Sequence, residues 1–299
     1  MRHEILRTIY PQPRLGDSGA ADPEQVVLPP EHPAVPRLMV RTIGVAEVES
    51  AVLKLVSTAF DVTAEVPVRA VLFRVADTEF VLAMVVDHIC GDGYSGSPLT
   101  RDLASAYAAR TLGHAPDWSP LSVQYADYTV WQHALLGSAD QPGSLAAEQI
   151  AYWRQALADL PDQLELPRDR PRPAVQSFAG GRVDLRIDAR THAALAGLAR
   201  AEGATLFMVV HTALAVLLAR LSGTDDIAIG TPIAGRGEAV LDDLIGMFVN
   251  TLVFRTPVDP GASFAELLAR QRDIDLQAFA HADVPFERLV EVLNPARST

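Results

Sequence analysis

The sequence contains one cysteine and one lysine. Cys90 has no second cysteine with which to form an internal disulfide bond. Lys54 is the only lysine among 25 basic residues, which face 37 acidic residues and leave a formal net charge of −12. A chain with this balance offers no basic face to nucleic acid or to an anionic membrane surface. We therefore expect neither nucleic acid nor membrane as a partner.

The sequence also lacks a targeting segment and an uninterrupted membrane span. Neither terminus shows a charged region followed by an apolar one, which predicts a cytoplasmic protein. The most apolar stretch, residues 204–221, is interrupted by His211 and Arg220. This pattern predicts a buried core helix rather than a helix that crosses a bilayer.

The length of the chain and its proline- and glycine-rich stretch predict two lobes. The chain has 299 residues, 49% of them hydrophobic, which is enough for two medium-sized cores. Residues 161–181 are rich in proline and end in a glycine pair, which is typical of a linker. The alternating Val183, Leu185 and Ile187 then predict a strand. We predict an N-terminal lobe at 1–160, a linker at 161–181 and a C-terminal lobe at 182–299.

The segment from Phe80 to Leu99, FVLAMVVDHICGDGYSGSPL, is the centre of the chain's organisation. Its first seven residues are apolar and predict a buried strand, and a helix is predicted from Leu99 to Arg110. The loop between them holds Asp87, His88 and Asp92, with glycines that allow a tight turn. A histidine beside an apolar strand is most often a hydrogen-bonded structural residue, so this loop needs support from other segments.

Periodicity predicts the remaining elements, and most of them are helices. The predicted strands are 68–75 and 79–86, joined by a short hairpin turn, and 226–230. The first predicted helix begins near Val45. The others cover 121–136, 144–157, 190–201, 205–221 and a segment that runs from a capping box at Ser263 to about Ala280.

Five segments, in this order, resemble the motifs of the condensation domains of nonribosomal peptide synthetases. They are RHEILRT from Arg2, HICGDG from His88, YADYTVW from Tyr125, IGMFVNT from Ile245 and HADVPFERLV from His281. The resemblance implies an α/β fold of two lobes, each a sandwich like chloramphenicol acetyltransferase, with the active site in the channel between them.

The resemblance also implies the chemistry. Condensation domains form an amide bond between an acyl or peptidyl thioester donor and an aminoacyl acceptor. Both are carried on phosphopantetheine arms of upstream and downstream carrier domains, with an adenylation domain as neighbour. The resemblance implies no metal and no cofactor bound by this chain itself.

Individual roles follow from the same motifs. His88 is implied as the catalytic residue, and Asp87, Asp92 and Gly93 as its structural support. In the family an arginine of the RHEILRT-like motif pairs with the aspartate, so Arg2 is the first choice of partner for Asp92 and Arg7 the second. His281 and Asp283 of the last motif are expected to hold a helix junction together. The implied residues of the channel wall are Gly246, Asn250 and Thr251.

The sequence departs from the family pattern at Asp87, where a first histidine is usual. Asp87, Asp92 and Ser95 also fit DxxxxDxxS, the motif of heterocyclisation domains, although the retained His88 favours condensation. Two competing functions are those of a free-standing acyltransferase that uses a soluble donor such as coenzyme A, and of a catalytically silent docking domain of the same fold. The family's opening motif and last strands are absent, which predicts a truncated chain with an incomplete C-terminal lobe.

Overall fold

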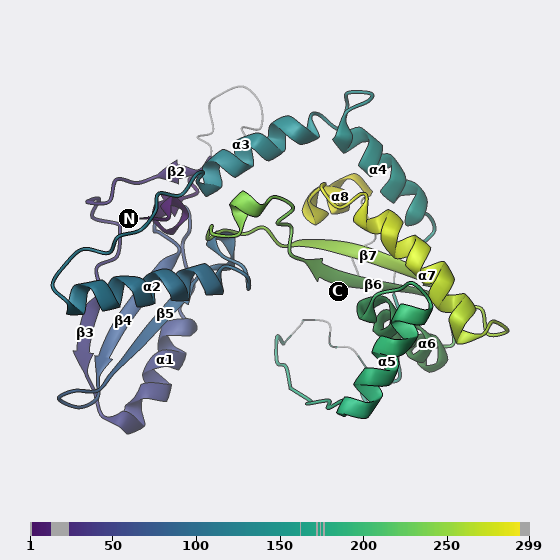
Figure 1. The fold of residues 1–299 in the computed structure, drawn as a ribbon, viewed down its shortest axis with the longest axis horizontal. Coiled ribbons are helices and arrows are strands. Elements are labelled where there is room, and N and C mark those ends of the chain that lie inside the picture. The colour runs from purple at the N-terminus through teal and green to yellow at the C-terminus, as the bar shows by residue number, and fades with distance from the viewer. Residues whose placement is uncertain are drawn as a thin grey trace. The chain divides into compact units, whose positions relative to one another are not determined.

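The computed structural model describes residues 2–12, 24–161, 163–171, 173, 175 and 177–293. The chain forms two compact units (Figure 1). Among the described residues, unit 1 holds a two-stranded and a three-stranded sheet and unit 2 holds one two-stranded sheet, each unit with its own helices. Unit 1 consists of Met1–Ala134 and Arg236–Val249, and unit 2 consists of Leu135–Gly235 and Asn250–Thr299.

Unit 1 is built on the three-stranded sheet β3–β4–β5, the antiparallel pair β1–β2 and the helices around them. Its elements, in chain order, are η1 (Glu4–Arg7), β1 (Thr8–Ile9), β2 (Val26–Val27), β3 (Met39–Thr42), η2 (Val45–Glu47), α1 (Val48–Val56), β4 (Val68–Arg74), β5 (Phe80–Val86), η3 (His88–Cys90), α2 (Gly96–Thr111), α3 (Tyr125–Leu136), which ends at the unit boundary, and η4 (Ala239–Leu241).

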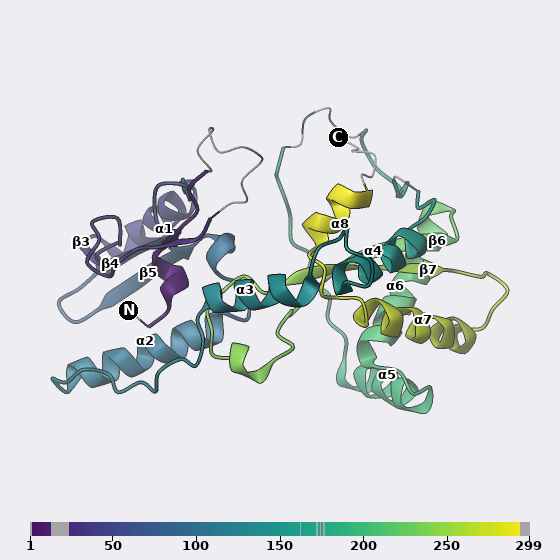
Figure 2. The same cartoon turned by 90° about the horizontal axis from the view of Figure 1, so that it is seen from above.

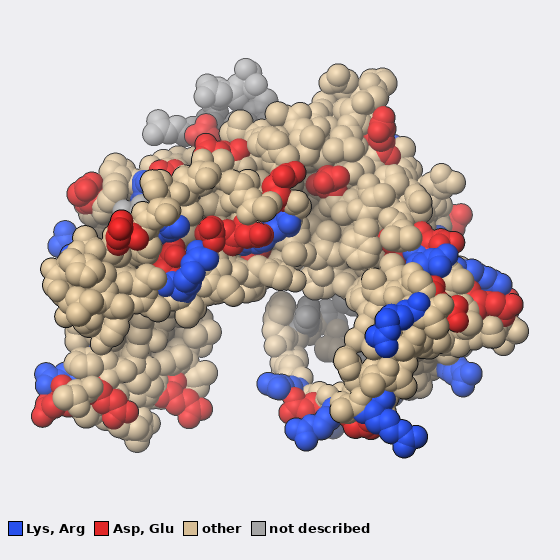
Figure 3. Space-filling view, in the orientation of Figure 1, with Lys and Arg blue, Asp and Glu red and all other residues tan. Residues whose placement is uncertain are grey.

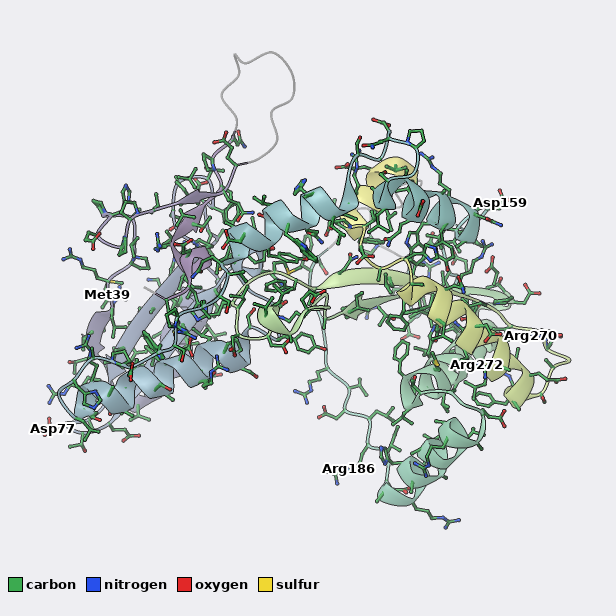
Figure 4. The ribbon with its side chains drawn as sticks, turned by 45° about the horizontal axis from the view of Figure 1, so that its top comes forward. Met39, Asp77, Asp159, Arg186, Arg270 and Arg272 are labelled. Atoms are coloured by element: carbon green, nitrogen blue, oxygen red, sulfur yellow. The ribbon has the colours of Figure 1, made fainter. Side chains whose placement is uncertain are left out.

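The β4–β5 hairpin confirms the two predicted strands and the turn between them, but β5 is not the predicted buried strand. Of its seven residues only Ala83 is buried, and Phe80 and Leu82 are 48% and 38% exposed. The two strands are antiparallel, with Val68 opposite Val86 and Arg74 opposite Phe80. Asp77 lies in the turn that joins them (Figure 4). On the other edge of β4, β3 pairs in parallel. Helix α1 packs its residues Ala51, Val52 and Leu55 on one face of this sheet, and α2 lies on the opposite side (Figure 2).

Unit 2 is a two-stranded antiparallel ribbon surrounded by helices. Its elements are α4 (Leu145–Ala156), α5 (Ala189–Ala201), α6 (Leu206–Ser222), β6 (Asp226–Ile233), β7 (Asn250–Pro257), α7 (Phe264–Phe279) and α8 (Phe286–Leu293). Figure 1 shows α5 and α6 on one side of the ribbon and α4 and α8 on the other. The largest core cluster joins α4, β7, α7 and α8 around Trp153 and Phe254.

The two units divide the chain differently from the predicted lobes. Residues 135–160 belong to unit 2 because α4 buries Ile150 and Trp153 against β7. The segment Arg236–Val249 belongs to unit 1 because its backbone is hydrogen-bonded to Asp92 and Ser95. A boundary placed at a proline-rich stretch cannot show that the chain later returns to the first unit.

The predicted strand at Val183, Leu185 and Ile187 is wrong. These residues belong to no helix or strand, and Val183 and Leu185 are 96% and 88% exposed. Arg186 marks this segment in Figure 4. A segment with alternating hydrophobicity forms a strand only where another strand supplies backbone partners. In the described chain β6 and β7 pair only with each other, so no strand is paired with this segment.

The helix boundaries in unit 2 follow their capping residues. The Thr205 hydroxyl accepts a hydrogen bond from the Met208 N–H at the start of α6, and Gly223 ends the helix in the left-handed region at φ 72°. Ser263 and Glu266 form the predicted capping box of α7. These local signals explain why both helices lie where the sequence predicts them.

Helix α6, predicted to be a buried core helix, buries one face only. Its buried residues include Met208, Val209 and Ala215, whereas Leu217 is 52% exposed. No single helix among the described residues is long and apolar enough to cross a membrane, and α5 with α6 passes such a test only as a pair bent by 104°. Acidic and basic side chains intermingle on the face of the molecule that Figure 3 shows.

Candidate active site

The candidate site begins where β5 ends. Asp87 follows the strand, and its carboxylate accepts a hydrogen bond of 3.0 Å from the Ile89 N–H, which caps η3. The next residue, His88, is exposed. Within the part of the chain that the structure describes, no hydrogen bond to the His88 ring is present. The imidazole therefore has both ring nitrogens available to another molecule.

Cys90 holds the loop in place through the packing of its buried side chain. Its side chain is fully buried and packs in a cluster with Ile5, Val68 and Ile245. Burial, helped by the nearby Asp87 carboxylate, raises the pKa of the thiol to about 12. The thiol is thus protonated at neutral pH and acts as a packing group rather than a nucleophile.

Asp92 is the buried polar centre of the loop. Its Oδ1 accepts hydrogen bonds of 2.8 Å from both the N–H and the hydroxyl of Ser95, and its Oδ2 accepts one of 3.0 Å from the Phe248 N–H. Arg236 completes the set with an ion pair of 3.3 Å. Burial alone raises the pKa of Asp92, but these hydrogen bonds and the arginine outweigh it and hold the pKa below its usual value.

The predicted pairing of Asp92 with Arg2 or Arg7 is wrong. The Arg2 Nε lies 2.7 Å from the carboxylate of Asp102, in α2, and Arg7 pairs with Glu4 at 2.9 Å. The motif at the N-terminus therefore fastens the start of the chain to α2 instead of to the site loop. Spacing along the sequence could not reveal this, because the two arginines and two aspartates offer several equally plausible pairs.

His3 strengthens the attachment of the N-terminus to α2. Its Nε2 lies 2.8 Å from Asp102, and the side chain is 6% exposed. Burial lowers the pKa of His3 despite that carboxylate. The backbone of the same segment is held by Gln124, which accepts from the Glu4 N–H and donates to the Arg2 carbonyl, each at 3.1 Å.

Sequence reasoning missed Arg236, the true partner of Asp92. Its side chain is 5% exposed, and the guanidinium lies 4.0 Å from the centre of the Phe248 ring. One nitrogen also donates to the carbonyls of Leu241 and Leu244. The signal in the sequence was an arginine between Gly235 and Gly237, directly after a strand, but nothing there indicated a partner 144 residues away.

Gly246 and Tyr125 join the YADYTVW and IGMFVNT motifs by direct contact. A Cβ atom on Gly246 would lie 2.2 Å from Cδ2 of the Tyr125 ring, so the ring occupies the space that a side chain would need. The Tyr125 hydroxyl donates a hydrogen bond of 2.6 Å to the Met247 carbonyl. Tyr125 of the first motif therefore packs on Gly246 and Met247 of the second, next to the Asp92 loop.

Gly246→Ala is expected to destabilise unit 1 by about 1–3 kcal/mol, because the tyrosine ring must move to admit the methyl group. Chemical denaturation of the purified variant measures this cost. Gly237→Ala is the matched control, since a Cβ there meets nothing within 4 Å. Tyr125→Leu combined with Gly246→Ala should cost less than the sum of the two single changes. Strict additivity would contradict the proposed overlap.

Asn250, predicted to line a channel, uses its whole amide inside unit 2. The Nδ2 group donates to the carbonyls of Ala282 and Val284, both at 2.9 Å, and Oδ1 accepts from the N–H groups of Phe286 and Thr251. No amide hydrogen is left for a substrate. Thr251 itself is half-buried in β7.

The HADVPFERLV segment is held by α4. Gln149, 1% exposed, accepts from the N–H of Asp283 at 3.0 Å and donates to its carboxylate at 2.6 Å. The His281 ring stacks on Tyr152 with ring centres 3.8 Å apart. These contacts agree with the prediction that His281 and Asp283 fix a helix junction. Within the described ranges, no group of three or more His, Cys, Asp or Glu side chains could hold a metal ion.

The chain is similar to parts of known nonribosomal peptide synthetases. The Dimodular nonribosomal peptide synthase of Bacillus subtilis (strain 168) is 50% identical over 297 residues, covering 99% of this chain and 12% of that protein. The probable non-canonical nonribosomal peptide synthetase CymA of Salinispora arenicola (strain CNS-205) is 48% identical over 296 residues, covering 99% and 4%. The chain thus spans a small part of these relatives.

A solved structure extends the likeness to the fold. The X-domain from teicoplanin biosynthesis, in its complex with OxyB, superposes with a TM-score of 0.88 and 36% identity, covering 99% of this chain and 63% of that one. The family model for the condensation domain matches residues 1–299. The chain therefore belongs to the condensation domain family and has its mixed α/β fold.

Proposed function

We propose that this domain forms amide bonds in nonribosomal peptide synthesis. The donor is an acyl or peptidyl thioester, the acceptor is the amine of an aminoacyl thioester, and the products are the amide and the freed donor thiol. The observation that carries the proposal is the exposed His88, whose ring has no internal partner in the described chain, while the Asp92 carboxylate of the same loop is held by hydrogen bonds from Ser95 and Phe248. An available imidazole on a rigid support is what this reaction requires.

His88 supplies the proton chemistry in this proposal. A thioester is already activated, and much of the acceleration comes from holding the amine beside it. The imidazole accepts the proton that the amine loses, or holds that amine in place while negative charge develops on the thioester oxygen. Asp92 stays ionised because its hydrogen bonds and Arg236 favour the charged form, so it orients the loop and transfers no proton.

The partners in the proposal are carrier domains. Upstream and downstream carriers present donor and acceptor on phosphopantetheine arms, beside an adenylation domain, and the chain binds no cofactor of its own. The relatives that support this arrangement are peptide synthetases many times longer than the chain. We propose the cytoplasm as the setting of the reaction.

A docking function is the second candidate. The X-domain that shares this fold was solved as a complex with OxyB. Asp87, in place of the first histidine, leaves one member of the usual motif absent. The intact His88 and the buried Asp92–Arg236 pair favour catalysis, because a surface used only for docking has no need of an available imidazole on a rigid loop.

The product identifies the function. The purified protein is given a carrier-bound acyl donor and an acceptor carrier loaded with cysteine, serine or threonine. The products are then released from the carrier, and their masses are measured by mass spectrometry. We expect an open-chain amide, formed equally by the control Asp77→Asn in the exposed β4–β5 turn.

Different products would support the competing functions. A product lighter by one water that disappears in Asp87→Asn would establish heterocyclisation. Amide formed as fast from a coenzyme A thioester as from the carrier would indicate a free-standing acyltransferase. A folded protein that yields no product but binds a tailoring enzyme would favour docking.

A further inference from the structure

Ser95 lies at the junction between the Asp92 loop and the segment Arg236–Val249. Its side chain is buried, with the residue 4% exposed. The hydroxyl oxygen lies 2.8 Å from the Asp92 carboxylate, 2.9 Å from the Gly246 carbonyl, 3.1 Å from the Gly246 N–H and 3.2 Å from a guanidinium nitrogen of Arg236. One hydroxyl thus joins both members of the buried ion pair to the backbone of Gly246.

The hydrogen-bond donors and acceptors around the Ser95 hydroxyl define its role. A serine hydroxyl has one hydrogen to donate and two lone pairs to accept with. The N–H groups of Gly246 and Asp92 and the Arg236 guanidinium can only donate, so the Ser95 oxygen is the acceptor for all three; the Asp92 N–H, 3.3 Å away, is shared with the Gly246 carbonyl. Its single hydrogen goes to the Asp92 carboxylate or to the Gly246 carbonyl. An alanine at this position would leave buried donors of Gly246 and Arg236 without that acceptor.

Ordinary helix capping does not explain Ser95. The residue precedes α2, where a serine usually accepts a hydrogen bond from an N–H of the first helical turn. Here the hydroxyl makes no such bond, and it contacts the segment Arg236–Val249 instead. Because this hydroxyl is buried against Gly246, the serine of the DxxxxDxxS pattern does not offer it to a substrate.

We infer that Ser95 is a positioning residue that fixes the loop carrying His88. The inference rests on the proposed function, in which His88 must meet two carrier-bound substrates. The Asp92 N–H donates to the Gly246 carbonyl at 3.2 Å, so the loop is joined to Gly246 at Asp92 and again at Ser95. Loss of the Ser95 joint leaves the loop joined to Gly246 through Asp92 alone, so we expect the His88 ring, four residues before Asp92, to take up a wider range of positions.

Kinetics of Ser95→Ala, Ser95→Thr and Ser97→Ala test the inference. Ser97 is the matched control, an exposed serine in the first turn of α2. Rates are measured well below the melting temperature of each variant and normalised to folded protein. We expect Ser95→Ala to lower kcat about tenfold to a hundredfold with KM nearly unchanged, because misplacing a reacting group affects the chemical step. Ser95→Thr should restore most of the rate, and Ser97→Ala should match the wild type.

A second measurement does not depend on the reaction. The ring signal of His88 is assigned by NMR as the histidine signal that His88→Ala removes. We expect Ser95→Ala to shift or broaden this signal and Ser97→Ala to leave it unchanged. An unchanged His88 signal in Ser95→Ala, or a normalised kcat within twofold of the wild type, would overturn the inference. Failure of the wild type to form amide would refute the proposed function alone, since the NMR comparison would still decide the role of Ser95.

Discussion

Replacing His88 by alanine is expected to slow amide formation by about 10²–10⁴-fold, the usual contribution of a positioned acid or base. The fold should survive, because the ring is exposed and has no hydrogen-bond partner in the described chain. The capping bond from Ile89 to the Asp87 carboxylate and the burial of Cys90 do not involve the imidazole. The defect should therefore lie in kcat, with little change in melting temperature.

The measurement is the single-turnover rate of dipeptidyl product from pre-loaded donor and acceptor carriers, which separates chemistry from carrier exchange. His133→Ala is a suitable control, since His133 is an exposed histidine on α3 of the same unit. Thermal melting of both variants should coincide with the wild type. A His88→Ala variant that forms dipeptide at nearly the wild-type rate would remove His88 from the mechanism.

The elements that the sequence predicted well are those defined by neighbouring residues. The β4–β5 hairpin follows from two apolar runs and a short polar turn, and the caps Thr205 and Ser263 define helix starts through contacts within four residues. Such signals act locally, so they survive whatever the rest of the chain does. The location of His88 at a strand end could be predicted for the same reason.

The features that the sequence could not reveal depend on distant partners. The bond between Arg236 and Asp92 joins positions 144 residues apart, and an arginine carries no mark of which carboxylate it will meet. The segment at Val183 and Leu185 has a strand's pattern but no neighbouring strand among the described residues. Tertiary contacts therefore decided which arginine supports the site and which alternating segment became a strand.

Asp92→Ala is expected to destabilise unit 1 by about 3–5 kcal/mol, because it leaves a buried charge without its partner. The side chains of Asp92 and Arg236 are 0% and 5% exposed, so water cannot replace the carboxylate. The N–H groups of Ser95 and Phe248 lose their acceptor as well. Urea denaturation followed by tryptophan fluorescence measures the loss. As the control, Asp77→Ala breaks only an exposed ion pair with Arg74 and should cost less than about 1 kcal/mol.

Two further measurements distinguish a structural Asp92 from a chemical one. Because folding lowers the pKa of Asp92, its stabilising effect is present above the ordinary carboxyl pKa and is lost as the pH falls through the folded value. The wild type should therefore approach Asp92→Ala in stability under acid. Adding Arg236→Met to Asp92→Ala should recover part of the stability, since no lone charge then remains buried. If Asp92→Ala instead melts like the wild type yet is inactive, Asp92 takes part in the reaction itself and the buried pair is not what maintains the loop.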